Sequence, residues 1–138
     1  MNTPTHQISI PAILAASVAV MLLGGVWFAV LFARQYAAVL GRADAPKTAM
    51  PPLYFVGPSL CMLVTAIGCA ILMAALRVGS LAEAVRFGAI VGVCLLGTTA
   101  MNMAINPNIP RPIAYGVLSG GYFLLSSLVI STTLFLLS

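Results

Sequence analysis

The chain has 138 residues, of which 62% are hydrophobic and only 6% are charged. A soluble domain carries about a quarter charged residues, so this composition excludes a water-soluble globular protein. The formal net charge of +4 comes from six Lys or Arg against two Asp or Glu, with no run of basic residues. The sequence therefore predicts no nucleic-acid binding.

Four long apolar stretches occupy most of the chain, and each reaches the ~20 residues needed to cross ~30 Å of hydrocarbon. We expect these spans at approximately 8–33, 53–76, 84–105 and 113–137. Little chain is left over for a separate soluble module. The sequence therefore predicts one transmembrane domain over residues 1–138, an all-α integral membrane antiparallel four-helix bundle whose main partner is the lipid bilayer.

The first stretch is predicted to be a retained helix rather than a signal peptide. No positive residue precedes it, and it is longer than a normal signal core. Ser9 is placed to cap this helix, and Pro11 is tolerated in its first turn. The helical pattern continues past the hydrocarbon to Gly41, a residue type that often ends helices. Trp27 and Tyr36 are predicted to anchor the helix at the membrane interface.

The connections between the other stretches contain clear helix start and stop signals. Pro58 lies about one turn inside the second stretch, where a membrane helix accommodates it with a kink. Ser80 followed by Glu83 predicts a capping box at the start of the third stretch. Glu83 and Arg86 are spaced to pair on one helix face. Residues 106–112 contain three prolines and should end the third helix sharply.

The distribution of basic residues predicts the topology. Four spans place both termini on one side of the membrane, and positive residues concentrate in cytoplasmic connections. The first and third connections carry Arg34, Arg42, Lys47 and Arg111, and the second carries Arg77 and Arg86. We therefore expect a multi-pass protein of a bacterial cytoplasmic (inner) membrane with its termini outside.

Small residues recur along every stretch at near-helical spacing. Helices in lipid associate by close backbone approach rather than by burying apolar surface, so these residues indicate packing faces. The predicted helix-packing positions are Gly25, Gly88, Gly92, Gly116 and Gly120. Such stripes either pack helices within one chain or join copies of the chain, so a homo-oligomer is the alternative to internal packing.

A group of polar residues lies in the third and fourth stretches and at their ends. It comprises Glu83, Arg86, Asn102, Asn106, Arg111 and Tyr122. The two asparagines, together with Thr98 and Thr99, are expected to hydrogen-bond to the fourth helix and hold the last two helices together. A small polar pocket for an unknown ligand is the alternative.

Two sequence motifs resemble a family of small four-span bacterial membrane proteins, domain of unknown function 1761. The first helix carries Leu-Gly-Gly-Val-Trp-Phe at 23–28 and Phe-Ala-Arg-Gln-Tyr at 32–36. The last hairpin carries Asn106, then Arg111-Pro112, then Gly121-Tyr122. Phe28 and Tyr36 depart from the family's usual Tyr and Trp, and the loop before Arg111 is richer in proline. The resemblance covers about residues 8–138 and implies a fold and a location, but no mechanism.

The sequence assigns no catalytic, cofactor-binding or metal-binding residues. His6 stands alone in the N-terminal tail, the three cysteines form no C-x-x-C pair, and no mid-membrane acid is present to couple transport to protons. We expect a small polytopic membrane protein with a structural or accessory role. The alternatives are an oligomeric small-molecule or ion transporter or channel, and a membrane enzyme acting on a lipid or quinone near Trp27 and Arg34.

Overall fold

The computed structural model describes residues 7–138, and all regular structure in this range is helical, as the sequence predicted. His6 lies outside the described residues. Two of the predicted helices contain a π-helical segment, labelled η. In chain order the elements are α1 (Ile10–Val26), η1 (Trp27–Leu31), α2 (Ala33–Val39), α3 (Leu53–Ala75), α4 (Leu81–Ile90), η2 (Val91–Gly97), α5 (Thr98–Ala104) and α6 (Pro112–Leu137).

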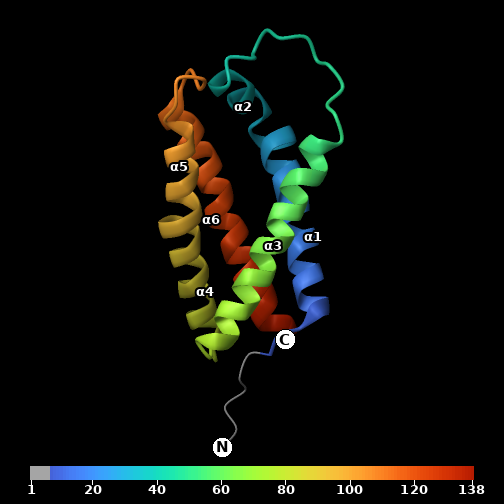
Figure 1. Cartoon of the computed structure of the whole chain (residues 1–138), viewed down its shortest axis with the longest axis vertical. Helices are drawn as coiled ribbons and strands as arrows, with labels where there is room; N and C mark the ends of the chain where they lie inside the picture. The colour runs from blue at the N-terminus through green and yellow to red at the C-terminus, as the bar shows by residue number, and fades with distance from the viewer. Residues whose placement is uncertain (1–6) are drawn as a thin grey trace, which may run out of the picture.

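Four helical runs are long and apolar enough to cross a membrane, and they indicate an integral membrane protein. They cover Ile10–Leu31, Leu53–Ala75, Leu81–Ala104 and Pro112–Leu137, close to the four predicted spans. The runs lie side by side and alternate in direction (Figure 1). The start of α1, the α3–α4 turn and the C-terminus share one end, which we call the turn end. The segment α2 and the start of α6 share the other, which we call the α2 end (Figure 1).

The predicted helix ends are present, with one addition. The Ala12 N–H donates to the Ser9 side chain (3.4 Å), and Gly41 has the left-handed backbone (φ 69°) that closes α2. At the start of α4, the Glu83 N–H donates to Ser80 Oγ (3.2 Å). The Glu83 carboxylate in turn accepts from the Gly79 N–H (2.7 Å), one residue earlier than in a standard capping box. The addition is Arg77, which also has a left-handed backbone (φ 54°).

The contact between α6 and the α4–η2–α5 run is a close approach of backbones. A Cβ atom at Gly88 would lie 2.9 Å from the Ser127 carbonyl oxygen, and one at Gly92 would lie 2.8 Å from Leu124 Cα. Both distances are shorter than real Cβ contacts allow. Only glycine fits at these two positions, so the first Gly-x-x-x-Gly pair packs within the chain.

The π-helical segment η2 keeps one face of this run turned toward α6. Small buried residues lie four apart at Ala84, Gly88 and Gly92 and again at Ala100 and Ala104, with the partly buried Leu96 between the two sets. In an α-helix a spacing of four drifts ~40° around the axis at each step. From Gly92 to Ala100 this drift amounts to ~80°, and the extra residue of the π-helical turn offsets about that much.

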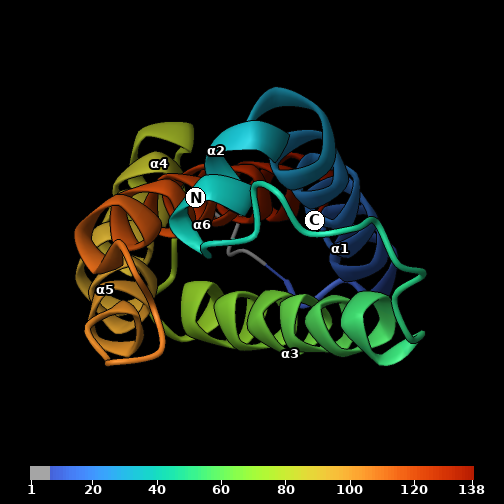
Figure 2. The same cartoon turned by 90° about the horizontal axis from the view of Figure 1, so that it is seen from above.

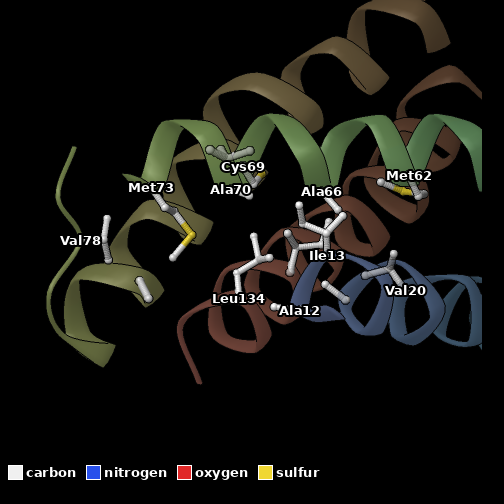
Figure 3. Packing of buried hydrophobic residues seen from close by; sticks show 14 of the residues in the cluster. Ala12, Ile13, Val20, Met62, Ala66, Cys69, Ala70, Met73, Val78 and Leu134 are labelled. Atoms are coloured by element: carbon white, nitrogen blue, oxygen red, sulfur yellow. The ribbon is translucent and has the colours of Figure 1, made fainter. Parts of the chain in front are cut away.

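α3 packs differently, through side chains against α1 and the C-terminal part of α6. Seen from above, α3 lies along the side of the molecule opposite α2 (Figure 2). Figure 3 shows Met62, Ala66, Ala70 and Met73 directed from α3 toward side chains of α1 and α6 such as Leu134. Pro58 lies inside α3 without ending it. The opposite face of α3 carries large exposed apolar side chains, as expected for a helix that borders lipid.

Candidate functional site: a groove at the α2 end

An open groove of about 500 Å³ lies at the α2 end, between the segment that contains α2 and the start of α6. Its size falls in the range of small-molecule pockets. Most of its lining is apolar, and Gln35 and Arg111 supply the polar and charged groups. The lining residues are Phe32, Gln35, Ala38, Val39, Arg111, Ala114, Val117 and Leu118.

The groove exists because the first helix changes direction at Phe32. This residue leaves the helical backbone conformation (φ −119°, ψ 22°) directly after η1, and α2 begins at the next residue. The Trp27 indole N–H donates to the Leu118 carbonyl oxygen (3.1 Å), which fixes η1 against α6 just below the bend. The bend and this hydrogen bond together set the position of α2 relative to α6.

A cluster of aromatic rings beside the groove connects η1 and α2 with α6. Phe28 lies 4.8 Å from Tyr36 and 5.1 Å from Tyr122 between ring centroids, and Tyr36 stacks on Tyr115 at 6.2 Å. Tyr36 lies beyond the last residue of the first span. Burial raises the pKa of the Tyr36 phenol, and the neighbouring Tyr115 raises it further, while Arg42 acts in the opposite direction. The phenol therefore stays neutral at physiological pH and acts as a packing group.

Arg111 is the charged group of the groove. It is exposed and precedes the first residue of α6, a 26-residue helix that begins with Pro112. The chain has only two acidic residues, and among residues 7–138 neither forms an ion pair with Arg111. The partial positive charge of the helix N-terminus adds to that of the guanidinium. The open end of the groove is therefore electropositive, while its wall is apolar.

The predicted helix-packing glycines do not all share one role. Gly88 and Gly92 contact α6, and a Cβ at Gly116 would lie 3.2 Å from Met101 Cα. Gly120 faces Gly97 at an ordinary contact distance of 3.8 Å. Gly25 instead is exposed, with nothing within 4 Å of an added Cβ. The close contacts from α1 involve the neighbouring Gly24, where a Cβ would lie 3.0 Å from Tyr122 Oη.

The predicted polar group does not gather into one cluster. Glu83 and Arg86 lie at the turn end, Arg111 lies in the groove at the α2 end, and Tyr122 is buried against α1. No ion pair joins Glu83 to Arg86 within residues 7–138, although their spacing permits one. The set therefore forms neither a single ligand pocket nor a continuous path across the membrane.

The expectation that Asn102 and Asn106 tie the last two helices together is wrong. Asn106 bonds within its own loop, donating to Met103 O (2.5 Å) and accepting from the Asn108 N–H (2.8 Å). Thr98 and Thr99 bond to carbonyls of their own helix, and Asn102 is exposed. The extra residue in η2 turns these side chains away from α6.

Within residues 7–138, three other side chains form hydrogen bonds to carbonyl groups of a neighbouring helix, and these particular bonds were not predicted from the sequence. Ser127 donates to Gly88 O (2.7 Å), Tyr122 to Val20 O (3.2 Å) and Trp27 to Leu118 O (3.1 Å). Trp27 is half-buried, and its indole N–H donates to a carbonyl group of α6 rather than facing the membrane interface. Spacing does not select these three: Trp27 lies one helical turn from Gly24, but neither Ser127 nor Tyr122 has a glycine one turn away.

No three His, Cys, Asp or Glu side chains gather at a position that could hold a metal ion in the described part of the chain. Cys61, Cys69 and Cys94 are all free.

Comparisons with known proteins agree with the membrane architecture. A family model described as "Protein of unknown function (DUF1761)" matches residues 11–135, nearly the whole chain. Searches of curated proteins and of solved structures gave no match. The match includes both motifs that suggested the resemblance in the sequence, and the chain belongs to the DUF1761 family.

Proposed function

We propose that this protein is an accessory integral membrane protein that holds an amphiphile with a negatively charged headgroup in the α2–α6 groove. The observation that carries the proposal is the pairing of an apolar wall with the unpaired Arg111 at the end of a membrane span. An acyl chain fits the wall, and a phosphate fits a guanidinium beside a helix N-terminus. A membrane lipid supplies both groups in one molecule.

Trp27 gives a direct test, because it is the only tryptophan in the chain. Its ring centroid lies 4.5 Å from that of Phe32, and its indole bonds to Leu118, and both of these residues line the groove. Bromine on an acyl chain quenches tryptophan fluorescence only at short range. We expect brominated phosphatidylglycerol, at low mole fraction in nanodiscs, to quench Trp27 more strongly than brominated phosphatidylcholine does.

Two arginine variants decide the outcome. Arg111→Gln should remove the preference for the anionic lipid, whereas Arg34→Gln should retain it, because Arg34 is exposed and does not line the groove. Equal quenching by the two lipids in the wild-type protein would contradict the proposal, as would an unchanged preference in Arg111→Gln.

The orientation is part of the proposal. The α2 end carries Arg34, Arg42, Lys47 and Arg111, and the turn end carries Arg77 and Arg86. We place the α2 end in the cytoplasm of a bacterium and the termini outside. In a background without native cysteines, Thr48→Cys should react with an impermeant maleimide only after the membrane is opened, and Ser138→Cys should react in intact cells. The reverse pattern would invert the assignment.

A homo-oligomer is a second candidate, and one surface favours it. Gly25, in α1, and Ala29, in η1, are one turn apart, and both are exposed. The first Gly-x-x-x-Gly pair, by contrast, is occupied within the chain. If copies associate through α1, Gly25→Leu should convert an oligomer to a monomer in native mass spectrometry without loss of helix content. A wild-type protein that is already monomeric in native-lipid nanodiscs would eliminate this candidate.

A further inference from the structure

A second pocket of about 290 Å³ lies at the turn end, between the end of α3 and the start of α4. One part of its lining is apolar, and the other part is charged. The charged residues are Arg77, Glu83 and Arg86, and the apolar ones are Leu76, Val78, Phe87 and Ile90. It is separate from the α2–α6 groove, because the two pockets lie at opposite ends of the spans.

Arg77 occupies a backbone conformation that normally selects glycine. Its φ of 54° places it in the left-handed region, directly after the last residues of α3. The Val78 N–H donates back to Met73 O (3.0 Å), and Val78 is buried, so the turn is held in this shape. Arginine at this position is strained, and strained residues that persist are concentrated at binding sites.

The three charges of this pocket are not neutralised by one another. One Glu83 oxygen accepts from the Gly79 N–H (2.7 Å), which fixes the carboxylate near the pocket. Within residues 7–138, the guanidinium groups of Arg77 and Arg86 have no ion-pair partner. Two positive groups and one negative group therefore remain available to a ligand beside an apolar wall.

We propose that this pocket binds the headgroup of a lipid that carries both a phosphodiester and a primary ammonium. The two arginines match the phosphodiester, and the Glu83 carboxylate matches the ammonium. The apolar residues match the start of the acyl chains. A purely anionic headgroup would leave Glu83 facing negative charge, and a quaternary ammonium would offer Glu83 no hydrogen-bond donor.

Native mass spectrometry of the full-length protein, released from mixed micelles, tests this assignment. The probes are phosphatidylethanolamine, phosphatidylcholine and phosphatidylglycerol at equal mole fraction. Because the α2–α6 groove is itself expected to retain phosphatidylglycerol, the three lipids are compared in the Arg111→Gln protein, where we expect retained phosphatidylethanolamine to exceed each of the others. Arg86→Gln should reduce its retention about tenfold, the effect of losing one hydrogen bond to a charged group.

Glu83→Gln isolates the ammonium contact, because glutamine still accepts from the Gly79 N–H. It should abolish the preference for phosphatidylethanolamine over phosphatidylglycerol while the melting temperature changes little. Arg77→Gly should raise the melting temperature, because glycine relieves the backbone, and should lower retention of phosphatidylethanolamine. A structural role alone would not move these two readouts in opposite directions.

Three results would overturn the proposal. They are equal retention of the three lipids, unchanged retention in Glu83→Gln and Arg77→Gly, and equally effective competition by soluble phosphoethanolamine, which lacks acyl chains. Arg111→Gln should leave retention of phosphatidylethanolamine unchanged. This pocket and the α2–α6 groove therefore succeed or fail separately.

Discussion

Helix α6 meets its two long neighbours in opposite ways. Toward the α4–η2–α5 run it presents serines and backbone to Gly88 and Gly92, and the two main chains nearly touch. Toward the α1–η1–α2 run it presents aromatic rings such as Tyr115 and Tyr122. At Gly88 and Gly92 an added Cβ would meet backbone atoms of α6, which cannot move aside as a side chain can, whereas rings on the second contact can shift. We therefore expect the glycine side to tolerate substitution poorly and the aromatic side to tolerate it better.

The largest expected effect on stability is the difference between adding one methyl group at Gly92 and adding one at Gly68. Gly92→Ala should lower the free energy of unfolding by about 1–3 kcal/mol, because its Cβ would meet the Leu124 backbone. Gly68→Ala, within α3, has nothing within 4 Å of the added atom and should be neutral or raise it by up to ~1 kcal/mol. Unfolding in mixed micelles with increasing sodium dodecyl sulfate measures both. Equal effects would mean that α6 does not approach η2 as described.

A smaller effect tests the hydroxyl that joins the same two helices. Ser127→Ala removes the donor to Gly88 O and should lower stability by ~0.6 kcal/mol, and by no more than ~2. Ser59→Ala is the matched control, because Ser59 bonds only to Phe55 O on its own helix (2.6 Å). Its effect should be near zero in the same assay. A larger loss in Ser59→Ala than in Ser127→Ala would contradict the assignment.

The smallest effect concerns the aromatic side and depends on pH. The pKa of Tyr36 is raised in the folded state. The contribution of its neutral phenol to stability is therefore complete below the unfolded-state pKa of about 10, and it is lost as pH rises through the folded-state pKa. Relative to Tyr36→Phe, the wild-type protein should therefore lose stability above about pH 10. Unfolding of both proteins from pH 8 to 11 measures the difference. If the difference in stability between the two proteins stayed constant over this pH range, the Tyr36 phenol would not be buried in the folded state.

Hydropathy and capping chemistry were sufficient to predict the helices and most of their ends. The four spans, the Ser9 and Ser80 caps and the Gly41 terminus all depend on local signals, and the structure contains each of them. Gly41 and Arg77 show the limit of such signals. Both have a left-handed backbone, but only the glycine could be anticipated from residue type.

Which residues of a helix face its neighbour was harder to predict, because in the third span this depends on whether the backbone is α-helical or π-helical. An α-helical repeat from Gly92 places Thr99 and Asn106 on the packing face, whereas η2 moves that face to Ala100 and Ala104. The available sign was the spacing of four among small residues before and after Leu96. The groove was missed for a related reason, since it depends on the bend at Phe32, for which the sequence contains neither proline nor glycine.

Magic-angle-spinning NMR in lipid bilayers tests the glycine contact most directly. Labelled protein diluted into unlabelled copies restricts the signals to contacts within one chain. The close approach of η2 and α6 predicts a strong through-space correlation between the Cα atoms of Gly92 and Leu124. Gly68 should show no correlation of comparable strength to another helix, because nothing lies within 4 Å of a Cβ added there. A spectrum in which Gly68 shows such a correlation and Gly92 does not would contradict this close approach.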